Sequence, residues 1–107
     1  MNTRADDCIV VLCTCPDGDT AARLARTLVE QGLAACVNVI DCVRSIYRWR
    51  GETMEDREAL LVIKAPAARY ERLEQAIVAS HPYELPEIIA VPIERGFEQY
   101  LQWINEL

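Results

Sequence analysis

Two cysteines near the end of an apolar segment, Cys13 and Cys15, have the residue type and spacing of metal ligands. Residues i and i+2 of a strand point to the same side, so both thiols can face one ion. The only histidine, His81, adds an imidazole, and thiolates with an imidazole suit copper or zinc. The alternative is that the cysteines are small apolar core residues and that a histidine beside Pro82 is structural. Both interpretations stay open at this point.

Another concentration of functional groups lies between His81 and Glu87, in the sequence HPYELPE. It holds an imidazole, a phenol and two carboxylates, and its two prolines restrict the backbone. Such a segment can form a rigid half of a cation site. The alternative is a surface loop whose carboxylates are solvated.

Lys64 is the only lysine, and it follows an apolar run. Its ammonium must reach solvent or pair with a carboxylate such as Glu58 or Glu87. A structural ion pair is the simpler of the interpretations.

Aromatic residues with an arginine between them, Tyr47, Arg48 and Trp49, are the pattern of a base-stacking platform. The chain, however, has 11 basic and 17 acidic residues and a net charge of −6. Such a charge opposes binding to nucleic acid and to anionic membranes. We therefore expect these aromatic residues at an interface between copies of the chain.

Common catalytic motifs are absent: the sequence has no GxGxxG, GxxxxGK[ST], GxSxG or HExxH pattern. A cysteine–histidine dyad stays open, but no group to orient it is evident. We expect a protein that is not an enzyme.

The cellular setting follows from the cysteines and from the apolar runs. Five cysteines without a CxxC pair do not form a disulfide framework. No signal peptide is evident, and no stretch approaches the roughly 18 apolar residues of a membrane span. These features predict a cytoplasmic protein.

Hydrophobic periodicity identifies the elements that position these groups. It predicts strands over 8–14, 36–49, 53–65 and 87–91, and helices over 20–29, 66–81 and 97–104. Asp17 or Asp19 can cap the first helix, and Gly32 can end it. The order β-α-β-β-α-β with an added C-terminal helix is the ferredoxin-like α+β pattern. We expect one domain over residues 1–107, with a four-stranded antiparallel sheet covered on one face by the two long helices.

The strand over 36–49 is too long for the sheet of a single copy. At about 3.3 Å per residue it spans about 46 Å, against about 23 Å for 8–14. Its alternation slips at Ile40 and Asp41, which predicts a bulge or bend. The projecting hairpin carries Ile46, Tyr47 and Trp49 on an unpaired edge, and a second copy is its simplest cover. We therefore predict a homo-oligomer.

Short motifs from about Val10 to Ile104 occur together in this chain. They are LCT at 12–14 with PD at 16–17, LAACV at 33–37, SIY at 45–47 with Trp49, Glu58, IK at 63–64, HPY at 81–83, PEI at 86–88, and YL at 100–101 with WI at 103–104. In combination they resemble the CutA family of divalent-cation tolerance proteins. The resemblance implies a homotrimer of ferredoxin-like protomers whose long hairpins pack on neighbouring subunits.

The same resemblance implies copper binding, divalent-cation tolerance and response to metal ions, without catalysis. The implied ligands are Cys13 and His81, with Ser80 standing where the family often has another histidine. Cys15 is a possible substitute, and we expect the Glu87 carboxylate to orient or complete the site. The protein partner, if one exists, is unknown.

The family trimer is also similar to that of PII-type signalling proteins, whose inter-subunit clefts bind small molecules. The alternative function is therefore a PII-like signalling or adaptor module. Its candidate cleft residues are Tyr47, Trp49, Glu58, Lys64 and Tyr83, together with Glu87.

Overall fold

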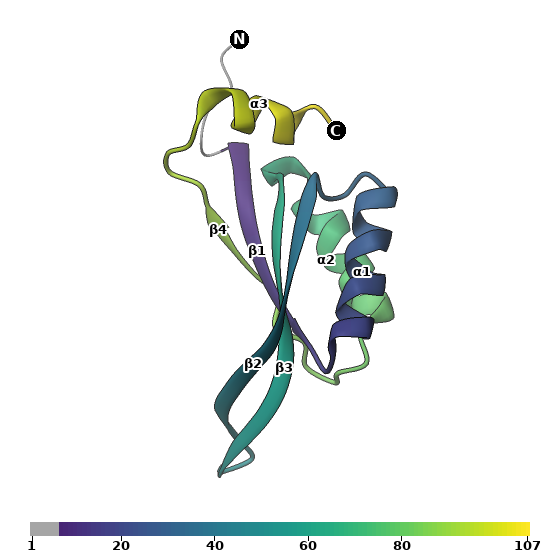
Figure 1. Ribbon diagram of the computed structural model, residues 1–107, viewed down its shortest axis with the longest axis vertical. Coiled ribbons are helices and arrows are strands. Elements are labelled where there is room, and N and C mark those ends of the chain that lie inside the picture. The colour runs from purple at the N-terminus through teal and green to yellow at the C-terminus, as the bar shows by residue number, and fades with distance from the viewer. Residues whose placement is uncertain (1–6) are drawn as a thin grey trace.

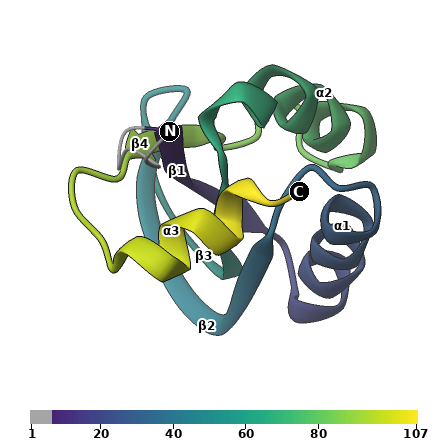
Figure 2. The ribbon, with the colours of Figure 1, turned by 90° about the horizontal axis from the view of Figure 1, so that it is seen from above.

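The computed structural model describes residues 7–107. Its elements are β1 (Cys8–Cys15), α1 (Gly18–Glu30), β2 (Cys36–Trp49), β3 (Glu52–Pro66), the short 3₁₀ helix η2 (Ala67–Arg69), α2 (Tyr70–Ser80), β4 (Ile89–Pro92) and α3 (Glu98–Asn105). The four strands form one antiparallel sheet in the order β2-β3-β1-β4. Helices α1 and α2 lie on one face of this sheet, and α3 lies across one end (Figures 1 and 2). The predicted ferredoxin-like α+β fold is confirmed.

Helix α1 has a predicted residue, Asp17, as its N-cap, but it begins at Gly18 and ends at Glu30, slightly beyond the predicted range at both ends. The Thr20 backbone N–H donates to the Asp17 carboxylate at 2.7 Å, which satisfies one of the free donors of the first turn. Gly32 has φ +70°, the left-handed conformation that glycine adopts at little cost beyond a helix end. The buried face of α1 consists of Ala21, Leu24, Ala25 and Leu28.

The core lies between the sheet and these two helices. Alternate residues of β1 and β3 point into it, so Val11 and Cys13 lie opposite Ile63 and Leu61 on the same face. Their partners from the helices are Leu28, Leu73 and Ile77, all fully buried. This arrangement makes Cys13 and Cys15 core-facing residues.

The opposite face of the sheet carries apolar side chains that no helix covers. It is formed by the alternate residues Val10, Leu12, Ile40, Leu60, Val62, Ile89 and Val91. Ile40, Ile89 and Val91 are 46%, 52% and 51% exposed. We call this surface the open face.

The hairpin of β2 and β3 projects beyond the rest of the sheet (Figure 1), and the molecule measures 50 × 25 × 22 Å. Its register shifts between Ile40 and Val43, where Cys42 has φ +62°, so the predicted irregularity is a β-bulge. The Asp41 carboxylate occupies the space that a Cβ at Gly18 would need. The bend in the hairpin therefore packs on the start of α1.

Some element boundaries differ from the predicted ones. Pro66 ends β3, where it lies opposite Cys8, and does not begin a helix; α2 starts at Tyr70 after η2. The last strand is Ile89–Pro92, shorter and later than the predicted 87–91. Pro92 pairs with Ile9 in β4, which lies at the edge of the sheet. A proline is tolerated in an edge strand because its missing N–H removes no hydrogen bond between strands. Within residues 7–107 no helix has the length and apolar character needed to cross a membrane.

Candidate functional site

The end of β1 presents different chemistry on its two faces. Cys13 and Cys15 point toward the helices, opposite Leu61 and Ala59 of β3, and both are fully buried. Thr14, between them, points to the other side and lines a cleft. The loop that follows α2 contacts both faces, through His81 on one and Tyr83 on the other.

Cys13, Cys15 and His81 form a compact group of metal-ligating side chains, which we call the thiol–imidazole cluster. One ligand atom from each lies within 4.8 Å of the others, and Cys15 Sγ is 3.8 Å from His81 Nε2. His81 reaches this position because it caps α2, with its N–H bonded to the Ile77 carbonyl at 2.8 Å, and is then turned away by Pro82.

Both ring nitrogens of His81 have hydrogen-bond partners. Nε2 lies 2.7 Å from the Thr14 carbonyl oxygen, and Nδ1 accepts the Tyr83 backbone N–H at 3.1 Å. A neutral imidazole with its proton on Nε2 satisfies both contacts. In this state His81 holds the loop after α2 against the end of β1.

Replacing His81 with phenylalanine should lower the free energy of unfolding by about 1–3 kcal/mol, because the Thr14 carbonyl and the Tyr83 N–H lose their partner. Urea denaturation measures this change. Ser80→Ala is the matched control, since its exposed hydroxyl bonds only to the Ala76 carbonyl of its own helix. Equal stability of the two variants would show that His81 does not hold the loop.

The two thiols influence each other's ionisation. The hydrogen bond to Cys15, followed by burial, raises the pKa of the Cys13 thiol well above its ordinary value. The same hydrogen bond lowers the pKa of Cys15, against the opposing effect of its burial. Cys15 is therefore the first of the pair to become a thiolate, and its sulfur lies 3.8 Å from the imidazole Nε2.

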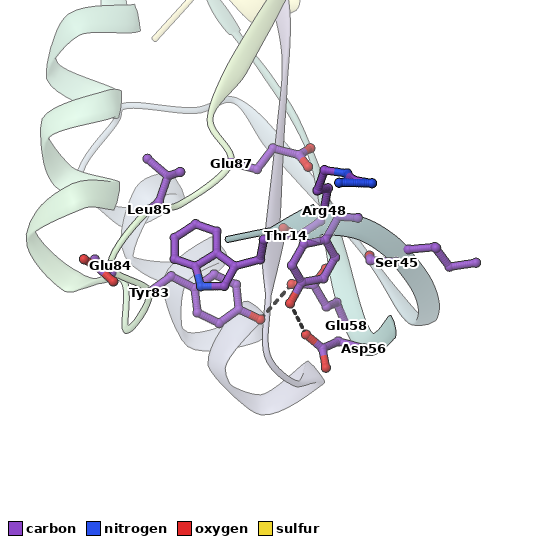
Figure 3. Close-up of a pocket in the computed structure, with 12 residues that line it drawn as sticks. Thr14, Ser45, Arg48, Asp56, Glu58, Tyr83, Glu84, Leu85 and Glu87 are labelled. Atoms are coloured by element: carbon purple, nitrogen blue, oxygen red, sulfur yellow. Dashed lines mark hydrogen bonds between the residues drawn. The ribbon is translucent and has the colours of Figure 1, made fainter. Parts of the chain in front are cut away.

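A cleft of about 630 Å³ lies on the other side of β1, between the β2–β3 hairpin and the loop after α2 (Figure 3). Its lining is mainly aromatic and acidic: Thr14, Ser45, Ile46, Tyr47, Arg48, Trp49, Asp56, Glu58, Tyr83, Glu84, Leu85 and Glu87. The volume is within the range of small-molecule sites.

Hydrogen bonds and an ion pair order the walls of the cleft. The Tyr83 hydroxyl donates to Glu58 at 2.7 Å, and the Tyr47 hydroxyl donates to Asp56 (Figure 3). Burial and the bond to Glu58 raise the pKa of Tyr83, so it stays a donor. From the hairpin turn, Arg50 pairs with Glu84 at 3.5 Å and thereby connects the hairpin to the loop.

Comparison with known proteins identifies the family of this chain. The model of the family described as CutA1 divalent ion tolerance protein matches residues 9–107. The chain belongs to the CutA1 family.

Relatives and solved structures agree with this assignment. The divalent-cation tolerance protein CutA of Thermus thermophilus is 46% identical over 97 residues, which cover 91% of this chain and 94% of that protein. The chloroplastic CutA protein of Arabidopsis thaliana is 41% identical; the match covers 91% of this chain but 53% of that protein. The crystal structure of CutA1 from Shewanella sp. SIB1 is 44% identical, with a TM-score of 0.90 and 94% of each chain covered.

Within this CutA1-family chain, the predicted metal ligands fall on both sides of β1. Cys13 and His81 meet in the thiol–imidazole cluster, and Cys15 is its third member. Glu87 lines the cleft instead, although its charge raises the pKa of Cys13. Its part in a metal site stays a prediction.

Five of the six predicted cleft residues line one cleft: Tyr47, Trp49, Glu58, Tyr83 and Glu87. Lys64 is outside it, and its ammonium bonds to the Asn38 side chain of the neighbouring strand, not to a carboxylate. The sequence reasoning missed Asp56, Glu84 and Thr14. Side chains of a strand alternate between its two faces, and this alternation could have identified Asp56 and Thr14. Asp56 lies on the same face as Glu58, and Thr14 lies on the opposite face from Cys13 and Cys15.

Proposed function

We propose that this CutA1-family protein binds copper, or another thiophilic metal ion, through Cys13, Cys15 and His81. Binding of this kind would support divalent-cation tolerance and the response to metal ions. The observation that carries the proposal is the approach of two thiols and an imidazole to within 4.8 Å of one another. Two sulfur ligands and one nitrogen are a soft donor set, which suits copper(I) or zinc.

The residues fit such an ion, with one cost. If His81 Nε2 held the ion, the ring proton would have to sit on Nδ1, and the contacts with the Thr14 carbonyl and the Tyr83 N–H would both be lost. The affinity is therefore lower than the donor set alone would provide. Cys15 compensates for the serine at position 80 by supplying a third ligand.

The assembly we propose is the homotrimer. Its support is physical: the open face exposes apolar side chains, and the hairpin extends past its own sheet (Figure 1). Metal binding, not catalysis, is the proposed activity. A cytoplasmic location belongs to the same proposal and is supported by five cysteines that are all unpaired.

Copper binding should weaken as the pH falls, because protons compete for both thiols and for the imidazole. The raised pKa of Cys13 means that its proton must be displaced even near neutral pH. The lowered pKa of Cys15 means that its thiolate persists to lower pH. A copper(I) competition titration between about pH 8 and pH 5 measures this. A pH-independent affinity would contradict thiolate and imidazole ligation.

The second candidate function is a PII-like module that binds a small molecule or a partner protein. One observation favours it: the cleft brings together Tyr47, Trp49, Glu58 and Tyr83 from the hairpin and the loop. On this alternative the ligand would bind beside the hairpin, on the opposite face of β1 from the thiols.

A further inference from the structure

We infer that the cleft beside the hairpin is a binding site for a small organic cation, an amine or guanidinium group carried on an aromatic or apolar body. This inference rests on the second candidate function and specifies its ligand class. It does not depend on metal binding, because the thiols of Cys13 and Cys15 lie on the other face of β1.

The charge of the cleft favours a cation. Four carboxylates line it, from Asp56, Glu58, Glu84 and Glu87, against the single guanidinium of Arg48. Three of these carboxylates already have partners: Tyr47, Tyr83 and Arg50. Within residues 7–107, Glu87 has no hydrogen bond or ion pair, so its full charge is available to a ligand.

The walls of the cleft favour an organic body over a bare ion. Tyr47, Trp49 and Tyr83 supply aromatic surface, which attracts cations through its electron-rich faces. The structure contains an internal example, since the Arg50 guanidinium carbon lies 5.2 Å from the centroid of the Trp49 ring. The cleft is also far larger than a metal ion requires, at about 630 Å³.

A hydroxyl group without a protein partner also lies in the wall of the cleft. Thr14 is 9% exposed and lines the cleft, and its side chain has no hydrogen-bond partner in the described part of the chain. No buried side-chain oxygen or nitrogen among the described residues lacks a hydrogen-bond partner, so the Thr14 hydroxyl oxygen is open to the cleft and available to a ligand. A ligand that enters the cleft can accept from this hydroxyl or donate to it while its cation faces Glu87.

The test uses three probes that share one ring: benzylamine, benzyl alcohol and phenylacetate. Isothermal titration calorimetry of the intact protein should detect benzylamine binding, with benzyl alcohol at least about tenfold weaker because it lacks the charge. Phenylacetate should not bind. No benzylamine binding at millimolar concentration, equal binding of benzyl alcohol, or a preference for phenylacetate would each overturn the inference.

Variants locate the site. Glu87→Gln should weaken benzylamine binding at least about tenfold, and Thr14→Val should weaken it severalfold. Glu71→Gln, an exposed change on α2, is the matched control and should bind like the unmodified protein. Circular dichroism verifies folding, and unchanged affinity in folded Glu87→Gln would overturn the assignment.

A further variant separates this site from the metal site. Cys13→Ser should lose copper affinity and keep benzylamine affinity. Loss of copper binding alone would leave the cation site standing, and failure of benzylamine to bind would leave the metal proposal standing. Loss of benzylamine binding in folded Cys13→Ser would contradict the separation of the two sites.

Discussion

Replacing Cys15 with serine should lower copper(I) affinity about a hundredfold or more. A serine hydroxyl is a hard, neutral ligand, so the site loses one of its two soft thiolates. Loss of a group that only hydrogen-bonds to a metal ligand already costs roughly 10- to 100-fold in metal affinity. Cys13→Ser should have a similar effect, because its sulfur belongs to the same group of atoms within 4.8 Å of one another. An anaerobic titration against a copper(I) chelator measures all three proteins.

The matched control is Cys42→Ser, which removes an exposed thiol at the bulge of the hairpin. Its copper affinity should equal that of the unmodified protein. Glu87→Gln in the same titration tests whether that carboxylate completes the site. Unchanged affinity in Cys13→Ser, Cys15→Ser and His81→Phe together would exclude the thiol–imidazole cluster as the metal site.

Replacing Val91 with arginine should convert the proposed trimer into single chains. Val91 lies opposite Val10 on the open face and is 51% exposed in the single chain. An arginine there places an unpaired charge in an apolar interface, which costs several kcal/mol. Light scattering coupled to size-exclusion chromatography measures the mass, which should fall from three chains to one.

Val78→Arg is the control for this experiment. Val78 is a comparably exposed valine, at 57%, but it lies on α2, which is on the helical side of the sheet. Its replacement should leave the mass at three chains. A single-chain mass for the unmodified protein, or an intact trimer in Val91→Arg, would contradict the proposed role of the open face.

Several features of this protein follow from the sequence alone, because they depend on neighbours along the chain. The i, i+2 spacing places Cys13 and Cys15 on one face of β1, since side-chain alternation is a property of any strand. The helical spacing from Ala21 to Leu28, with Asp17 before it, determines where α1 begins and which face it buries. The number of residues in β2 and in β1 can also be counted from the sequence. Because β2 is much longer than β1, the sequence predicts a hairpin that projects beyond the sheet.

Only the tertiary structure decided which distant groups meet. His81, not Glu87, joins the cysteines because α2 packs on the sheet and ends beside β1, where the imidazole bonds to the Thr14 carbonyl. Glu87, six residues later, emerges on the other side of β1 and lines the cleft. Lys64 bonds to Asn38 because β2 lies beside β3 in the register that the hairpin sets. Local periodicity encodes the face of each residue, whereas the packing of α2 and the strand register determine its partner.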